Sequence, residues 1–234
     1  EKGRVILTVK QTQDVLQFPV YRLPVAVDVH TQKGVERFNI VVDKQEQSFE
    51  FPVLSQPFLV KFDAENWLVA EVDVVQTDAF WLHQLGNSKN VINRHQAAEH
   101  MLQTKNPNLL STVAGIALAD KFWAVQLQGL ASANRWDETG KKKLQASVKK
   151  LLDSKNTRVR AKAIEVWSSF YDANDEKLYS QNIDFISYNV NEAALKAIGK
   201  TDPKRAAKAG LEGLNAQYRS WAGYCTELVA LYGT

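Results

Sequence analysis

The sequence predicts two parts in series: a small antiparallel β-sandwich followed by an all-α, HEAT/armadillo-like superhelical domain. From Arg4 to about Gln76 the side chains alternate with period two, as they do along β-strands. After about Thr77 the apolar positions recur at three- and four-residue spacing, which is typical of amphipathic helices. One helix-turn-helix pattern then recurs along the helical part, which is typical of helix pairs that stack into a solenoid.

The β part consists of five short runs rich in valine and phenylalanine. Turn sequences QKG, DKQEQ and DAEN divide several of them, and no helical pattern separates them, so antiparallel strands are expected. Two sheets packed face to face are the economical way to bury one face of each strand. The proline residues fit strand ends or edges, where a missing N–H donor is tolerated. The runs lie at residues 5–9, 25–29, 38–42, 49–53 and 58–62, and these prolines are Pro19, Pro24, Pro52 and Pro57.

The helical part opens with TDAFWLHQLG, which is interpreted as a short capped helix that ends at Gly86. Asn106 and Asp202 are each followed by proline, the pattern of an N-cap with proline at the first helical position. Helices are predicted at residues 78–85, 90–103, 107–119, 121–133, 141–153, 157–171, 175–186, 190–199, 203–218 and 220–232. We therefore expect a β-sandwich domain at 1–77, truncated at its N-terminus, and an α-helical solenoid-like domain at 78–234.

The clearest copy of the repeat is NTRVRAKAIEVWSSF, at residues 156–170, with Asn156 as its expected N-cap. Its apolar face is formed by Val159, Ala163, Val166 and Phe170, widened by Ala161, Ile164 and Trp167. Aligned copies place Arg94, Gln126, Arg160 and Asn191 at one repeat position, with spacings of 32, 34 and 31 residues. The alternative is an irregular helical bundle, because helix pairs of similar length produce loose periodicity without a true repeat.

The amino-acid composition excludes few classes of function. The chain has 234 residues and one cysteine, so it has no internal disulfide, and Cys225 is expected to be a small buried side chain rather than a nucleophile. The net charge is +3, and the basic clusters KKKLQASVKK and DPKRAAKA are interpreted as solvated helix faces, so neither a nucleic acid nor a membrane is expected as partner. No apolar run spans a bilayer and no signal-peptide pattern opens the chain, so a soluble protein of unknown compartment is expected.

The histidines do not form a catalytic motif. In HQAAEH, His95 and His100 are five residues apart, about 140° around a helix, whereas a zinc helix needs a pair four apart. His30 and His83 have no ligand-spaced partner, and there is no Gly-rich phosphate loop and no G-x-S-x-G elbow. We therefore predict no catalytic, cofactor-binding or metal-ligating residue. The aromatic residues Phe122, Trp123, Trp167 and Phe170 have the spacing of a core, not of a base-stacking platform.

Several segments can be compared with known families. They are TVKQTQ followed by FPVYRLPVAVDV, then PFLVKFDAENWLVAEVDV at the end of the β part, and DKFWAVQLQGLA and NTRVRAKAI in the helical part. Together they resemble the C-terminal half of the aminopeptidase N family of zinc metallopeptidases. The resemblance covers nearly the whole chain. It implies a small β-sandwich and a large helical domain, preceded in such enzymes by a thermolysin-like catalytic domain that holds the zinc.

The family's H-E-x-x-H helix, its downstream zinc glutamate, its G-A-M-E-N motif and its catalytic tyrosine match no stretch of this sequence, so no residue here inherits those roles. The resemblance therefore implies a noncatalytic fragment that begins just inside the sandwich, contains no cofactor and needs the missing catalytic domain as partner. Its helical domain would cap that domain and restrict access of peptide substrates to the zinc. The alternative is a protein-interaction scaffold related to catalytically inactive members of the family.

The repeat also predicts where a substrate or partner would bind. Stacked helix pairs rotate slightly from one to the next and create a concave face. Arg94, Gln126 and Arg160 recur near helix starts and would line that face. The alternative is that they bond neighbouring acidic side chains or turn carbonyls and serve only the stack.

Overall fold

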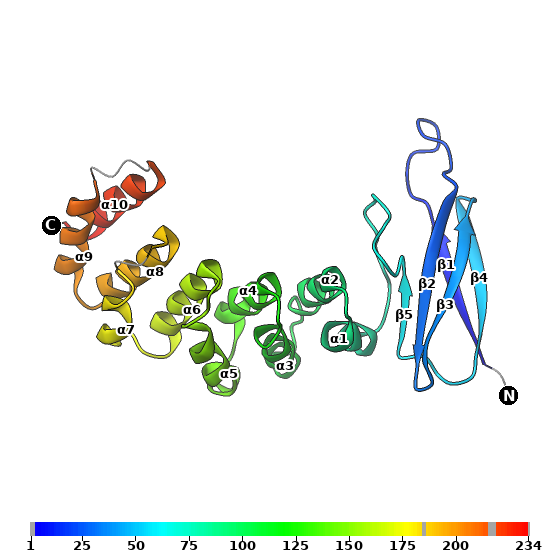
Figure 1. Cartoon of the computed structure of the whole chain (residues 1–234), viewed down its shortest axis with the longest axis horizontal. Helices are drawn as coiled ribbons and strands as arrows, with labels where there is room; N and C mark the ends of the chain where they lie inside the picture. The colour runs from blue at the N-terminus through cyan, green and yellow to red at the C-terminus, as the bar shows by residue number, and fades with distance from the viewer. Residues whose placement is uncertain (1–2, 184–185, 215–218, 234) are drawn as a thin grey trace. The chain divides into compact units, whose positions relative to one another are not determined.

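The computed structural model describes residues 3–183, 186–214 and 219–233 (Figure 1). Within them, strands occupy the first part of the chain and helices the rest, so the predicted order of β followed by α is confirmed. The chain divides into two compact units, Glu1–Ala97 and Ala98–Thr234. The predicted change at Thr77/Asp78 is where the first helix starts, but that helix and most of the next belong to the first compact unit.

The strands form two antiparallel sheets, as the period-two pattern predicts. The smaller sheet pairs β1 (Gly3–Lys10) with β4 (Glu46–Val53). The larger has the order β3–β2–β5, with β3 at Gly34–Val42, β2 at Leu23–Thr31 and β5 at Leu59–Phe62. Pro24 lies in the central strand, but β5 pairs with β2 only from Val27 to His30, so Pro24 needs no donor on that side.

One apolar cluster is shared by the two sheets. Valines of β2 alternate between buried and half-buried neighbours, and their buried face meets side chains from the β1–β4 sheet. Each strand thereby buries one face and exposes the other, which explains the period of two in the sequence. The buried members are Val25, Val27, Val29, Ile40, Val42, Phe51 and Val53, with Val5, Leu7, Val9 and Phe49 packed against them.

The first two helices are α1 (Asp78–Asn87) and α2 (Val91–Met101), and α1 packs against β5. The predicted cap of α1 is confirmed, because the Thr77 side chain accepts a hydrogen bond from the Phe80 N–H. The predicted end at Gly86 is one residue early. The helix continues because the Ser88 N–H reaches the Gln84 carbonyl and closes a further turn.

The second unit contains the remaining helices, and the predicted N-caps Asn106, Asn156 and Asp202 each accept a hydrogen bond from a backbone N–H of their helix. The helices are α3 (Pro107–Leu118), α4 (Trp123–Ala131), α5 (Glu138–Leu151), α6 (Thr157–Phe170), α7 (Glu176–Ser180), α8 (Tyr188–Gly199), α9 (Pro203–Gly213) and α10 (Arg219–Tyr232), with a 3-10 turn at Ser132–Arg135.

Several predicted helix boundaries differ from the structure, and three of the differences are informative. The helix predicted at 121–133 ends as α4 at Ala131 and continues only as the 3-10 turn. The helix predicted at 175–186 is the five-residue α7, and 184–185 lie outside the described residues. The helix predicted at 141–153 starts earlier, at Glu138, because the Asp137 side chain caps it through the Gly140 N–H. The end predicted for the helix at 203–218 lies outside the described residues.

The helices of the second unit stack in two rows (Figure 1). In one row α3 packs against α5, and in the other α4 packs against α6 and α6 against α8. Helices α2, α4, α6 and α8 begin at Val91, Trp123, Thr157 and Tyr188, which keeps the spacing found by aligning the sequence with itself. Arg135, in the 3-10 turn after α4, is hydrogen-bonded to the segment that follows α2. Its guanidinium donates to the carbonyls of Leu102, Gln103 and Thr104.

Candidate functional site

The recurring polar residues near the helix starts contact the turns that precede their helices. Arg94 Nη1 donates to the Ser88 carbonyl at 2.9 Å and to the Lys89 carbonyl at 3.1 Å. Gln126 Nε2 donates to the Asp120 carbonyl at 2.7 Å, which is also six residues earlier. Backbone carbonyls in these turns have no partner within a helix, so a side-chain donor at this repeat position satisfies them.

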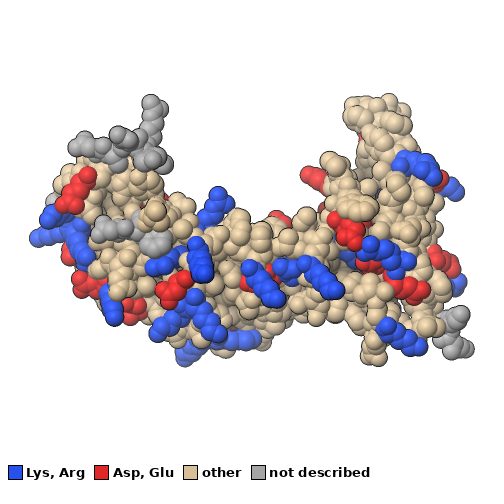
Figure 2. Space-filling model, viewed as in Figure 1, with Lys and Arg blue, Asp and Glu red and all other residues tan. Residues whose placement is uncertain are grey.

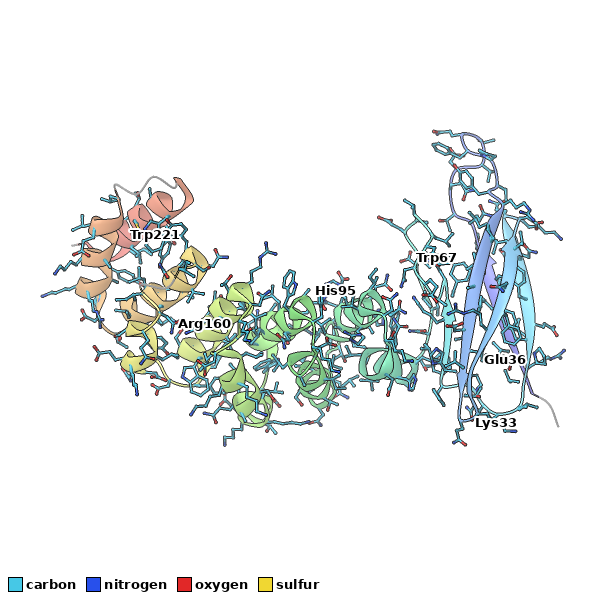
Figure 3. All side chains as sticks on the ribbon, viewed as in Figure 1. Lys33, Glu36, Trp67, His95, Arg160 and Trp221 are labelled. Carbon is cyan, nitrogen blue, oxygen red and sulfur yellow. The ribbon has the colours of Figure 1, made fainter. Side chains whose placement is uncertain are left out.

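Arg160, the third member, makes a different contact of the same kind. Its Nε donates at 2.9 Å to Oδ1 of Asn182, which is fully buried, and Asn182 Nδ2 donates to the Leu178 carbonyl at 2.7 Å. Arg160 thereby joins α6 to the chain that follows α7 (Figure 3). The fourth position, Asn191, is buried as well. These contacts support a structural role for Arg94, Gln126 and Arg160, in which they hold neighbouring helices together, and not a role in lining a substrate-binding face.

Replacing Arg160 with alanine is expected to lower the free energy of unfolding by about 1–3 kcal/mol, because the buried Asn182 Oδ1 loses its charged donor. Urea denaturation measures this. Lys162→Ala is the matched control, because it removes only a surface pair with Glu165, worth about 0.2–0.5 kcal/mol. An unchanged urea midpoint in Arg160→Ala would contradict this role of Arg160 in holding α6 to the chain after α7.

The face of α6 that the sequence predicts as apolar is buried over most of its length. Val159, Ala163, Ile164, Val166 and Trp167 are buried, whereas Ala161 and Phe170 are half-buried. The prediction of a core position for Phe122 is wrong. Its side chain is 36% exposed, because Phe122 is the N-cap residue of α4 and lies outside the helix.

The two histidines of α2 do not point to one site. His95, labelled in Figure 3, is half-exposed, and His100 is exposed. Because five residues separate them, their side chains leave the helix in different directions. Among the described residues, no group of three or more His, Cys, Asp or Glu side chains is placed to hold a metal ion. Within that part of the chain, no set of side chains fits the zinc site that the resemblance implies.

The other two histidines come together, which the sequence did not predict. His30 on β2 and His83 on α1 meet edge to face with ring centroids 5.9 Å apart, and Phe58 lies 4.4 Å from His83. They are 53 positions apart in the sequence, and only the packing of α1 on β5 brings them together. Desolvation lowers the pKa of both histidines, and the charge of His83 lowers the pKa of His30 further, whereas Asp28 acts in the opposite direction.

The first unit is expected to lose stability as the pH falls below about 6.5, the ordinary pKa of histidine. Because both folded-state pKa values lie below the unfolded ones, the unfolded chain binds more protons in this range and acid favours it. Urea midpoints at pH 7.5 and 5.5 test this. The drop should be smaller in His83→Gln, which cannot be protonated. An equal drop in both proteins would contradict a contribution from this pair.

Neither the single cysteine nor the lysines of α5 form a candidate site. Cys225 is buried in α10, and burial raises the pKa of its thiol, as expected for a small packed side chain. Four lysines of α5 are exposed, as predicted for a solvated helix face, whereas Lys141 is half-buried and pairs with Glu138. Figure 2 shows Lys and Arg side chains, in blue, over the helical part of the chain. No helix of the described residues is both long enough and apolar enough to cross a membrane.

Comparison with solved structures gives a likeness that spans nearly the whole chain. No protein-family model and no curated protein matches the chain. Among solved structures, the chain is similar to Legionella pneumophila aminopeptidase A, whose crystal structure holds aspartic acid, with a TM-score of 0.60 and 13% identity. The match covers 99% of this chain but 34% of that one, so the chain spans about a third of its relative's length. At this identity the likeness shows a shared fold.

Proposed function

We propose that this chain, which shares its fold over 99% of its length with about a third of an aminopeptidase, is the noncatalytic C-terminal part of a zinc aminopeptidase. The observation that carries the proposal is the extent of the match. It runs through the strands and the helices in one alignment, so both parts contribute to the likeness. A likeness limited to stacked helices would not suggest one kind of enzyme, because helical repeats serve many functions.

We infer that the two antiparallel sheets form a small sandwich, since both supply side chains to one apolar cluster. We infer that the helix pairs form a HEAT/armadillo-like superhelix, since α4, α6 and α8 stack successively and begin at the spacing of the repeat.

The proposed role is to close over the catalytic domain and restrict which peptides reach its zinc. The partners would be that domain and the peptide substrates, and the zinc ligands would lie outside this chain. The inner surface of the stacked helices, and no residue of the β part, would meet the substrate. Because Arg94, Gln126 and Arg160 bond turn carbonyls or the neighbouring Asn182, the shape of that surface would matter more than these side chains.

The experiment compares the purified parent protein with this chain alone. The parent is expected to carry an upstream H-E-x-x-H helix, to retain one zinc ion after dialysis and to release N-terminal residues from short peptides. This chain is expected to retain no zinc and to hydrolyse no aminoacyl substrate. Elemental analysis and peptide assays measure both. Stoichiometric zinc in this chain, lost on replacing His95 and His100, would contradict the absence of a metal site.

Peptides of increasing length test whether the helical part restricts access to the zinc. In the parent, kcat/KM is expected to fall as peptides lengthen beyond the enclosed space, because longer chains must enter a restricted opening. A parent that binds no zinc and lacks the upstream motif would instead favour the interaction scaffold. An active parent with no dependence on peptide length would leave the aminopeptidase in place but remove the capping role.

A further inference from the structure

The β3–β2–β5 sheet has two faces that are covered in different ways. One face joins the apolar cluster shared with the β1–β4 sheet, and alternate side chains of β5 pack against that cluster. Because side chains alternate along a strand, Leu59 and Lys61 lie on the opposite face, where both are buried. Helix α1 packs against β5, and its His83 contacts His30, the register partner of Leu59. Helix α1 therefore covers this second face (Figure 1).

The second face carries charged and titratable side chains, which the shared cluster lacks. Asp28 and His30 of β2 lie on it, because they pair with Lys61 and Leu59 of β5. The side chains of the shared cluster are aliphatic or aromatic and do not titrate. Protonation can therefore weaken the packing of α1 on the sheet without reaching the cluster that holds the two sheets together. We call this packing the α1–sheet contact, in which His30 and Phe58 meet His83.

Two histidines face each other in the α1–sheet contact. The ring centroids of His30 and His83 are 5.9 Å apart, and both side chains are half-buried. Two protonated imidazoles at this distance repel each other, and partial burial reduces the screening by water. Burial lowers the pKa of both rings, and Asp28, which raises the pKa of His30, is the smallest of the three influences on that ring. Acid therefore favours a state in which the two rings are separated and exposed.

The hydrogen bonds of Asn87 fit only the uncharged ring of His83. Asn87 Nδ2 donates to the His83 carbonyl at 3.0 Å, which fixes the orientation of the amide, and it lies 3.3 Å from His83 Nδ1. An amide nitrogen cannot accept a hydrogen bond, so Nδ1 is the acceptor and carries no proton. A proton on Nδ1 would place two donors opposite each other. The other titratable group of α1, Asp78, is exposed in the first turn and away from this contact.

The carboxylates near the two histidines already have partners. Asp28 accepts from Arg37 Nε at 2.7 Å and from Arg37 Nη2 at 2.8 Å. Glu65 pairs with the same guanidinium at 2.7 Å. Asp63 accepts two backbone N–H groups and also acts electrostatically on Lys61, which is a further basic group on this face. These carboxylates therefore offset two added positive charges only in part.

We propose that the α1–sheet contact is an acid-sensitive hinge. As His30 and His83 become protonated, α1 separates from the β3–β2–β5 sheet, whereas the two sheets stay packed on their shared cluster. An acidic environment would thus loosen the attachment of the first helix to the strands, and neutral pH would restore it. The hinge is a property of the first unit and does not depend on the proposed function.

Native-state hydrogen exchange of the full chain tests the hinge at about pH 7.5 and about pH 5, on either side of the ordinary histidine pKa of 6.5. Protection factors are compared, because they correct for the intrinsic effect of pH on exchange. Those of α1 are expected to fall at least about tenfold in acid, and those of the β1–β4 pair by less than about twofold. His83→Gln and His30→Gln, made separately, should each remove most of the fall in α1. His95→Gln is the matched control, since His95 is half-exposed on α2 and outside the contact, and it should keep the full fall.

Three other outcomes would each overturn the hinge. Equal losses of protection in α1 and in the β1–β4 pair would mean that acid unfolds the first unit as a whole. A fall in α1 that persists in both glutamine variants would assign the acid response to another group. Unchanged protection of α1 would mean that the contact tolerates protonated histidines. Each variant is compared with itself at the two pH values, so a general loss of stability in one variant does not imitate the expected result.

Discussion

Replacing Trp167 with alanine is expected to lower the free energy of unfolding by roughly 3–5 kcal/mol. The side chain is 5% exposed on α6, its ring centroid lies 5.2 Å from that of Tyr171, and Lys149 Nζ lies 5.8 Å from the ring. Among the described residues, the indole Nε1 has no hydrogen-bond acceptor. The loss therefore comes from apolar burial and the cavity left behind. Denaturation followed by far-UV circular dichroism measures it.

Two controls frame the Trp167 result. Val166→Ala removes a smaller buried neighbour and is expected to have a smaller effect. Trp67→Ala removes an indole that is 82% exposed and is expected to change stability by less than about 0.5 kcal/mol in the isolated chain. An unchanged midpoint in Trp167→Ala would mean that this face of α6 is not packed as described.

Tyr179→Ala is expected to have the other large effect, again roughly 3–5 kcal/mol by analogy with buried aromatic residues. The side chain is 1% exposed and its hydroxyl donates to the Asp172 carbonyl. Burial, with the charges of Asp175 and Asp172, raises the pKa of the phenol well above its ordinary value, so it remains a donor at working pH. Helix α7 has five residues, too few to be stable alone, and Tyr179 fixes it to its surroundings.

Tyr179→Phe separates the ring from its hydroxyl. It keeps the buried ring but removes the donor to Asp172, so it is expected to cost about 0.5–1.5 kcal/mol. The same denaturation measurement compares the two variants. Equal losses in both would place most of the energy in the hydrogen bond and contradict the packing role of the ring.

The helix-pair contacts bear on how specificity would arise in the proposed enzyme. The donors of Arg94, Gln126 and Arg160 contact turn carbonyls or Asn182, so substitutions there should act first on the stack. Related enzymes that prefer peptides of different lengths would then differ in the spacing of their helix pairs. In the proposed enzyme, the helical part would limit access to the zinc by its shape and would supply no catalytic side chain.

Local structure could be predicted from the sequence, because the interactions that fix it lie within a few residues of one another. Alternation of valines in β2 follows from one buried face per strand, and it predicted the antiparallel sheets. Asn106 and Asn156 were recognisable as N-caps because their side chains bond N–H groups two and three residues on. The repeat spacing was readable because each copy starts its second helix in a similar way.

Contacts between residues that are distant in sequence depend on how the helices and strands pack, so the sequence pattern did not reveal them. His30 and His83 meet because α1 packs on β5, and Arg160 finds Asn182 because α6 lies beside the end of α7. Phe122 was mispredicted because an apolar residue at helical spacing can lie at an exposed helix start. The helix predicted at 175–186 was too long, because the helical pattern of the sequence continues beyond Ser180, where α7 ends. The exposure of the apolar side chains Leu16 and Trp67 could not be predicted from the sequence. Exposure of a loop side chain depends on what packs against the loop and not on the residues of the loop itself.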